Sequence, residues 1–232
     1  MMKILSRDSL PLGGFAGIEE HRLVTDSRIF GARKSPLTFE GIGNLVYIAD
    51  AKYKPFGSSG MHPHSEIDII SIIVKGRVSH EGSLEHGTDL TAGDVQVQRA
   101  GGEGFSHDEI NPDGTQNRML QIWALPEEKG QRASYKSYRP ALSGSTRIYG
   151  GDKTQNDTFD SGTTIDIVNL NAGAHFESDS ETLVYVITGD ARINSTKPLD
   201  DTIQSISEGD LVRSEGISVV AVDETQLLVV RH

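Results

Sequence analysis

The 232-residue chain has no cysteine, which excludes disulfide bonds, thiolate zinc sites and a thiol nucleophile. Aromatic residues make up only 6% of the chain while glycine occurs 25 times, and this balance favours a turn-rich β protein over a helical bundle. The 22 basic residues are outnumbered by 33 acidic ones, giving a formal charge of −11. Because an acidic surface repels phosphate groups, direct binding to nucleic acid is disfavoured.

Long hydrophobic runs are also missing, and no segment approaches the length needed to cross a membrane. The segment Met1–Asp8 lacks the continuous apolar stretch of a signal peptide. We therefore expect a cytoplasmic protein without a membrane partner. The length of the chain is compatible with one large domain or two small ones.

What the chain does contain is a series of short segments that are rich in β-branched residues or alternate between polar and apolar ones. Little helical periodicity interrupts them, so an all-β fold of the sandwich or barrel type is predicted. A polar stretch over residues 126–140 breaks the pattern and is interpreted as a linker with at most one turn of helix. The predicted strands cover residues 45–49, 67–74, 94–98, 119–125, 164–170, 182–188, 191–194, 210–213, 218–222 and 227–231.

A faint internal repeat relates the two halves of the chain. Residues 74–76 (VKG) match residues 187–189 (ITG), and residues 92–95 (AGDV) match residues 208–211 (EGDL). We interpret the halves as two copies of one β-barrel. The two expected domains cover residues 1–130 and 131–232.

Two short motifs carry the strongest chemical signal in the sequence. His62 and His64 form an HxH pair, and His107 and Glu109 form an HxE pair further along the chain. Because residues i and i+2 share one face of a strand, two facing strands would gather three imidazoles and one carboxylate around one point. Such a set suits a first-row transition metal and leaves coordination positions open, as in catalytic sites. We predict all four residues as metal ligands.

The same reasoning predicts no metal in the second half of the chain. When the repeat is aligned, two of the four ligand positions become apolar, so the second barrel is expected to be metal-free. The histidines His80, His86 and His232, taken singly, are interpreted as solvated surface residues. The counterparts of the four ligands, in chain order, are His175, Glu177, Val219 and Ala221.

Residues 60–64 (GMHPH), followed by Asp68 and Gly76, resemble the first motif of the cupin superfamily, and the stretch from Gly93 to Asn111 resembles the second. More narrowly, the first half of the chain resembles pirin and the bacterial pirin-like proteins. The segments that carry this resemblance are HPH at 62–64, GRVSH at 76–80, GDVQ at 93–96, AG at 100–101, HDE at 107–109 and LQIW at 120–123.

The resemblance implies a bicupin, with two tandem cupin barrels of the jelly-roll type and one metal, usually iron, in the N-terminal barrel. It carries over His62, His64, His107 and Glu109 as ligands. It also implies an activity of the quercetin 2,3-dioxygenase type, with O2 and a flavonol-like aromatic substrate as partners. Glu109 is then expected to have a catalytic role as the general base that takes the substrate's hydroxyl proton.

Several alternatives remain open at this point. Fe(II) is the expected metal, but Ni, Cu, Zn, Mn and Co bind the same kinds of ligand. Vertebrate pirins are regarded as nuclear co-regulators, so a non-enzymatic protein that binds a protein partner according to metal oxidation state is the second hypothesis. A sugar or small-molecule isomerase is a third and weaker one. Asp68 and Asn111 are candidates for orienting a ligand imidazole.

Overall fold

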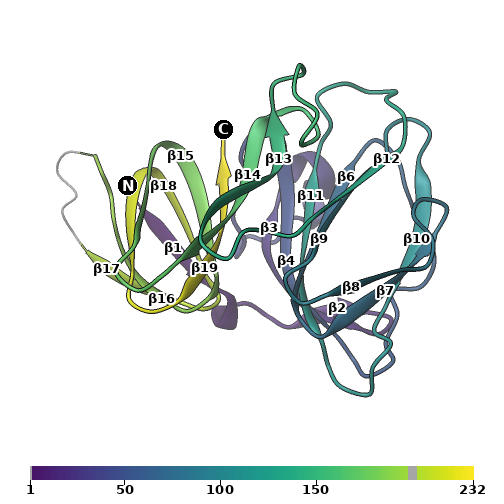
Figure 1. Ribbon diagram of the computed structural model, residues 1–232, viewed down its shortest axis with the longest axis horizontal. Coiled ribbons are helices and arrows are strands. Elements are labelled where there is room, and N and C mark those ends of the chain that lie inside the picture. Colours follow the sequence, from purple (N-terminus) through teal and green to yellow (C-terminus); the bar gives the residue numbers. More distant parts are fainter. Residues whose placement is uncertain (1, 198–202) are drawn as a thin grey trace. The chain divides into compact units, whose positions relative to one another are not determined.

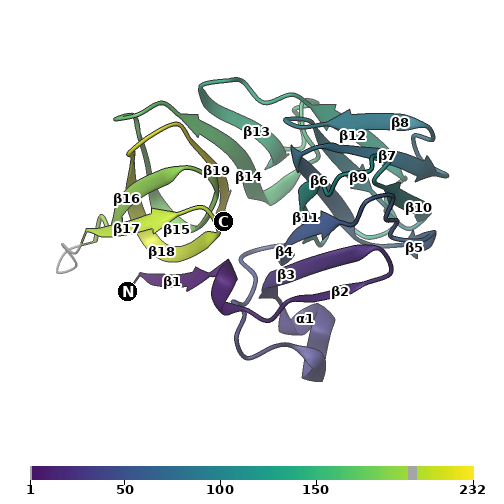
Figure 2. The same ribbon diagram turned by 90° about the horizontal axis from the view of Figure 1, so that it is seen from below.

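The computed structural model describes residues 2–197 and 203–232, and the chain divides into two compact units. One unit, the N-terminal barrel, comprises Leu10–Arg139, and the other, the C-terminal barrel, comprises Met1–Ser9 and Pro140–His232. Strands make up most of both units, as Figures 1 and 2 show, so the prediction of an all-β protein is confirmed. No helix within the described ranges has the length and apolar character needed to cross a membrane.

The N-terminal barrel is built from a four-stranded and a seven-stranded sheet. Hydrogen bonds order the smaller sheet β5-β10-β7-β8 and the larger sheet β12-β9-β6-β11-β4-β3-β2. In chain order the elements are β2 (Gly13–Phe15), β3 (Ile18–Thr25), α1 (Ser27–Phe30), the 3-10 turn η2 (Gly31–Arg33), β4 (Leu45–Tyr53), β5 (His62–His64), β6 (Asp68–Lys75), β7 (Arg77–Gly82), β8 (Thr88–Thr91), β9 (Val95–Arg99), β10 (Phe105–Ile110), β11 (Arg118–Ala124) and β12 (Ser134–Tyr138).

The C-terminal barrel forms one continuous sheet in the order β13-β14-β19-β15-β18-β16-β17, and β1 pairs with β18. Its elements are β1 (Lys3–Ser6), the 3-10 turn η1 (Arg7–Ser9), β13 (Gly144–Gly151), β14 (Ser161–Leu170), β15 (His175–Thr188), β16 (Asp190–Asn194), β17 (Gln204–Ser207), β18 (Asp210–Ala221) and β19 (Thr225–Arg231).

The two units divide the chain differently from the expected boundary between residues 130 and 131. Ser134–Tyr138 lies within the segment interpreted as a linker, yet it forms β12 and pairs with β9 of the N-terminal barrel. That segment therefore holds a strand where a turn of helix was allowed for. At the other end, β1 pairs with β18 of the C-terminal barrel. In both cases long-range pairing with an open sheet edge decides the structure, and the local sequence does not show it.

The interior of the N-terminal barrel alternates between apolar and polar layers along its strands. On one face of β6, Ile69 belongs to an apolar cluster with Phe105, and Ile73 belongs to a second cluster with Met119. Ser71 lies between them on the same face, because residues two apart in a strand share a face. We call the six buried polar side chains at this level the polar layer; they are Ser71, His80, Gln96, Gln98, His107 and Glu109.

The C-terminal barrel has an apolar interior by contrast. Its core cluster includes Val184 and Val186 of β15 and Val219 and Ala221 of β18. Burying apolar surface stabilises a fold by about 25 cal/mol per Å² without requiring any hydrogen-bond partner. The two barrels therefore share a strand pattern but differ in the residues that fill their interiors.

The turn between β6 and β7 depends on Gly76. Its φ is 77°, in the left-handed region, and a Cβ built on it would lie 2.9 Å from the Cβ of Asn117. Gly130 has the same φ of 77° but no neighbouring atom within 4 Å of such a Cβ. Comparing substitutions at Gly76 and Gly130 therefore separates the free-energy cost of a side chain on a left-handed backbone from the cost of a steric clash.

We expect Gly130→Ala to destabilise the protein by about 1 kcal/mol, the cost of placing a side chain in the left-handed region. Gly76→Ala should cost roughly 1–3 kcal/mol more, because the new methyl group also overlaps Asn117. Urea unfolding of both variants measures the difference. Equal losses of stability would show that the turn relaxes around the added methyl group.

Candidate metal centre

The HxH and HxE motifs meet as neighbouring strands of the smaller sheet. Strands β5 and β10 are antiparallel, and His62 lies opposite His107 in the ladder. The Nε2 atom of His107 lies 3.1 Å from Nε2 of His62 and 3.1 Å from Nε2 of His64. One ligand nitrogen from each of the three imidazoles lies within 4.8 Å of the others. The structure thus brings together the three histidines that the sequence singles out.

The spacing of these nitrogens fits a metal ion. With metal–nitrogen bonds of about 2.1 Å, two ligands at right angles have nitrogens roughly 3.0 Å apart. His62 Nδ1 lies 2.7 Å from the carbonyl oxygen of Gly60, so it donates and leaves Nε2 as a lone pair in the neutral ring. Two imidazole lone pairs at 3.1 Å repel each other unless a cation or a proton lies between them. The donor set therefore suits a divalent transition metal.

Burial and mutual repulsion keep these rings neutral. Burial, together with the neighbouring imidazoles His107 and His62, lowers the pKa of His64 from 6.5 to about 3. Burial, together with His62 and His80, lowers the pKa of His107 from 6.5 to about 3. Only the unprotonated ring can bind a metal, so both side chains are ready to act as ligands at neutral pH.

Glu109 stands apart from the three-histidine cluster, although it lines the same cavity. The residue is 2% exposed, and its carboxylate accepts three side-chain hydrogen bonds. Ser71 Oγ donates to Oε1 at 2.7 Å, Gln96 Nε2 donates to Oε1 at 3.0 Å, and Tyr53 Oη donates to Oε2 at 3.1 Å. Burial and the charge of Glu109 raise the pKa of Tyr53 well above its usual value, so the phenol stays a donor.

His80 corrects one sequence interpretation. It was expected to be a solvated surface residue, yet it is 0% exposed and lies directly behind His107. Its Nε2 lies 3.1 Å from His107 Nδ1 and 3.1 Å from Gln98 Nε2. His86 and His232 are exposed, as predicted. Side chains alternate between the two faces of a strand. The place of His80 on β7, the strand next to β10, was therefore a signal that it pointed into the barrel.

Strand β9 was predicted to be half-buried, and this is wrong, since all five of its residues are buried. Gln96 and Gln98 share the inner face and reach Glu109 and His107 respectively. Neither glutamine was identified as a site residue from the sequence. Two amides that alternate with valines in a strand could equally well form a solvent-exposed face. Burial by the surrounding strands therefore decides the outcome.

Asp68 and Asn111 make hydrogen bonds to partners other than the ligand imidazoles. Asp68 pairs with Arg99 at 3.1 Å in a buried ion pair. The Asn111 amide donates to the backbone carbonyl oxygens of Lys54 and Thr115. Both residues therefore stabilise the barrel around the site. The side chains that contact His107, the role predicted for Asp68 and Asn111, are those of Gln98 and His80.

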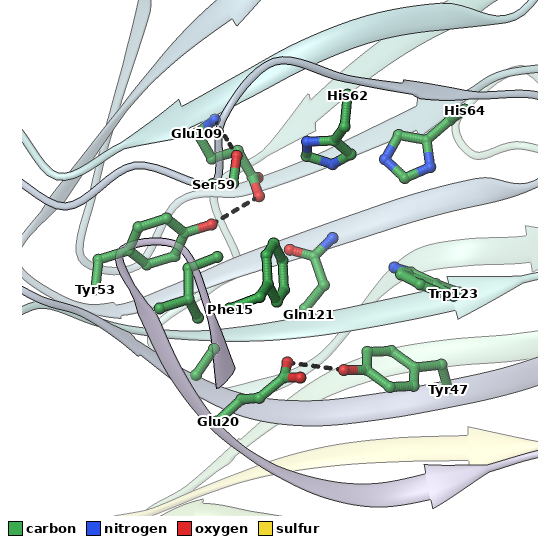
Figure 3. Close-up of a pocket in the computed structure, with 12 residues that line it drawn as sticks. Phe15, Glu20, Tyr47, Tyr53, Ser59, His62, His64, Glu109, Gln121 and Trp123 are labelled. Atoms are coloured by element: carbon green, nitrogen blue, oxygen red, sulfur yellow. Dashed lines mark hydrogen bonds between the residues drawn. The ribbon is translucent and has the colours of Figure 1, made fainter. Parts of the chain in front are cut away.

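A small cavity of about 40 Å³ lies beside the histidines. Figure 3 shows the rings of His62 and His64 on one side of it and Gln121 and Trp123 on the other. The Tyr47 and Trp123 rings lie 4.5 Å apart between centroids. The mixture of aromatic and polar lining is typical of a small-molecule site.

The cavity wall opposite the histidines includes a buried acid that the sequence did not reveal. Glu20 of β3 is 4% exposed and accepts hydrogen bonds from Tyr47 Oη at 2.8 Å and from Arg22 Nε at 2.7 Å. Burial and the charge of Glu20 raise the pKa of Tyr47 well above its usual value. No strand was predicted before residue 45, so β3 and its contribution to the cavity were missed.

The C-terminal counterparts need a correction of one residue. In the β15–β18 ladder Phe176 lies opposite Val219, the arrangement that His62 and His107 have in the N-terminal barrel. His175, aligned with His62 by the sequence repeat, is exposed, whereas Phe176 packs on the apolar core. Glu177 is exposed as well. The inward positions are thus more apolar than predicted, which supports the prediction of a metal-free second barrel.

The chain matches the profile of the Pirin family over residues 43–124. A relative named quercetin 2,3-dioxygenase, from Escherichia coli strain K12, is 33% identical over 102 residues. The match covers 44% of this chain and 44% of that relative, so the chain matches less than half of the relative's length. The predicted resemblance to the pirin family is confirmed, and it is carried by the N-terminal barrel.

Solved structures extend the likeness of fold to the whole chain. The bacterial pirin YhhW of Escherichia coli, in complex with nickel(II), gives a TM-score of 0.82 at 21% identity and covers 100% of this chain and 98% of its own. Quercetin 2,3-dioxygenase from Acinetobacter baumannii gives 0.68 at 20% identity, with 98% and 84% covered. The prediction of two tandem cupin barrels of the jelly-roll type is confirmed.

The lowered pKa of His64 and His107 predicts a pH dependence of stability in metal-free protein. As the pH falls below 6.5 the unfolded chain binds protons at these rings, whereas the folded chain does not until about pH 3. The free energy of unfolding should therefore fall with pH across this window. His64→Gln should lessen the slope, and His175→Ala, an exposed control, should not. Urea titrations of chelator-treated protein measure it; identical slopes for native protein and His64→Gln would contradict it.

Proposed function

We propose that this chain, a member of the pirin family through residues 43–124, binds one divalent transition metal in its N-terminal barrel and oxidises a flavonol-like substrate with O2. The observation that carries the proposal is the placement of His107 Nε2 at 3.1 Å from two further imidazole nitrogens at the wall of an aromatic cavity. The quercetin 2,3-dioxygenase name of the Escherichia coli relative and the nickel(II) complex of the bacterial pirin support it.

His62, His64 and His107 would hold the metal, with Glu109 as a proposed fourth ligand. When bound, the metal would supply Lewis acidity toward a chelating hydroxy-ketone and electron exchange with O2. Fe(II) fits this chemistry, and the donor set also suits nickel and the other first-row ions. The side chains of Tyr47 and Trp123 in the cavity wall offer aromatic surface against which a flat ring of the substrate would pack.

Glu109 is proposed to take the hydroxyl proton of the substrate. Its two oxygens accept three hydrogen bonds from Tyr53, Ser71 and Gln96, which fix the carboxylate in place. Each carboxylate oxygen has two lone-pair sites, so Oε2, with Tyr53 as its one side-chain donor, can still accept a proton from the cavity. A general base typically contributes on the order of 10²- to 10⁴-fold to a rate.

Substitution of the histidines tests the metal site directly. His62→Ala, His64→Ala and His107→Ala should each lose metal while the barrel still folds, because its two apolar clusters remain intact. Trp123 is the chain's single tryptophan, and its ring lies 6.2 Å from that of His64 between centroids. Bound Ni(II) should therefore quench its fluorescence in native protein and in the control His175→Ala, but not in the three variants. Elemental analysis should give one metal per chain, and two tightly held ions would contradict a metal-free second barrel.

Substrate pairs test the chemistry. Quercetin should be consumed with uptake of O2 by iron-loaded protein, and a flavone lacking the 3-hydroxyl group should not, since it cannot chelate the metal as an anion. Glu109→Gln should retain some metal through its amide oxygen and react on the order of 10²- to 10⁴-fold more slowly. His64→Ala protein provides the blank for spontaneous oxidation. Equal rates with the two flavonoids would rule out chelation, and no O2 uptake with any flavonol would favour a regulatory, partner-binding protein.

A further inference from the structure

A chain of hydrogen bonds runs from the backbone of Glu85 to the metal-facing ring of His107. His80 Nδ1 lies 2.8 Å from the carbonyl oxygen of Glu85. His80 Nε2 lies 3.1 Å from Gln98 Nε2, and Gln98 Oε1 lies 3.0 Å from His107 Nδ1. The three side chains are 0%, 0% and 1% exposed, so water does not replace any link in this chain.

The direction of every hydrogen bond in this chain follows from the acceptor at its start, the carbonyl oxygen of Glu85. A carbonyl oxygen only accepts, so the proton of a neutral His80 ring is on Nδ1 and its Nε2 is an acceptor. Both Gln98 Nε2 and His107 Nδ1 lie 3.1 Å from this acceptor and can donate to it. With its NH2 group toward His80, Gln98 turns its carbonyl oxygen toward His107, so both neighbours of His107 Nδ1 are acceptors. His107 Nδ1 must then donate, and its Nε2 is left as a lone pair. That atom is the one 3.1 Å from Nε2 of both His62 and His64.

We propose that Gln98 and His80 are positioning residues that hold His107 as the Nδ1–H tautomer, so that its Nε2 lone pair faces the metal site before a metal arrives. The free imidazole of histidine prefers its proton on Nε2, which would block the ligand atom. Hydrogen bonds behind a ligating imidazole fix its tautomer and orientation in metalloproteins generally. The inference rests on the proposed metal site, but it is independent of the substrate and of O2 chemistry.

The backbone at Glu85 shows that this arrangement is maintained against strain. Its φ is 54°, in the left-handed region that residues other than glycine rarely adopt. The following glycine, Gly87, donates its N–H to the carbonyl oxygen of His80 at 2.9 Å and closes the turn. The strained residue is therefore the one that presents its carbonyl oxygen to the His80 ring, where the direction of the whole chain is set.

Three substitutions separate the roles of the two residues. Gln98→Met keeps the length of the side chain but removes both its donor and its acceptor. His80→Phe fills the same space without nitrogen atoms. His80→Gln is the conservative variant, because its amide oxygen can accept from Gln98 where Nε2 did. His175→Ala, at an exposed position of the C-terminal barrel, is the matched control.

Two readouts that do not involve catalysis decide the matter. Ring ¹H–¹⁵N spectra of the metal-free full-length protein should show His107 as the pure Nδ1–H tautomer in the native chain, and as a mixture in Gln98→Met and His80→Phe. Competition with a chelator should show Ni(II) affinity weakened roughly 10- to 100-fold in these two variants. His80→Gln should recover most of the affinity, and His175→Ala should match the native protein.

Native Ni(II) affinity together with an unchanged His107 tautomer in Gln98→Met would overturn the inference. Should the variants not fold, the native spectrum alone still decides, because an Nε2–H tautomer for His107 in metal-free native protein contradicts the hydrogen-bond chain. A protein with the expected tautomer and Ni(II) affinities but no flavonol oxidation would support the role of Gln98 and His80 and count against the proposed function. The two conclusions therefore fail separately.

Discussion

The need to satisfy every buried polar group governs the N-terminal barrel. Removing a hydroxyl, amide or imidazole from water without a partner costs about 1–3 kcal/mol in proteins. The polar layer meets most of this requirement internally, because Gln96 and Ser71 donate to Glu109 while Gln98 bridges His80 and His107, although Oε1 of Gln96 has no hydrogen-bond partner among the described residues. Once one member has its direction set by a backbone carbonyl, the others have little freedom to choose theirs. The proposed metal centre is therefore the exposed end of a network whose order is established in the core.

The C-terminal barrel shows what the same strand pattern becomes without that network. At the ladder position where the first barrel pairs His62 with His107, the second pairs Phe176 with Val219. The apolar pair needs no partners, so the interior closes into a continuous hydrophobic cluster. A single fold thus serves two purposes, and the difference lies in the residue types at inward-facing positions. Because successive side chains of a strand point to opposite faces, a shift of one residue exchanges inward-facing for outward-facing positions. The sequence alignment of the repeat was shifted by one residue here, so it placed the exposed His175 at a ligand position.

Local patterns were sufficient for the strands with strong β-branched signals and for the two histidine motifs. The β6 strand follows from its run of isoleucines, and His62, His64 and His107 converge because HxH and HxE spacing keeps side chains on one face. Features that depend on distant pairing could not be read in this way. Strand β12 exists because β9 offers an open edge, and the predicted strands at 210–213 and 218–222 are one strand, β18, because the chain continues through Gly216. His80 and Gln98 look like surface residues until the neighbouring strands enclose them.

The division of labour between the two sheets explains why the site needs the whole barrel. The smaller sheet contributes the three imidazoles of the proposed metal site, from β5 and β10. The larger sheet supplies the opposite wall of the cavity, including Tyr47 and Trp123. Glu109 is on β10, yet its three side-chain donors come from β4, β6 and β9 of the larger sheet. The Gln98 bridge crosses in the same direction. Hydrogen bonds that end on Glu109 and His107 thus link the two sheets. A metal that binds only the folded barrel would stabilise the barrel as a whole.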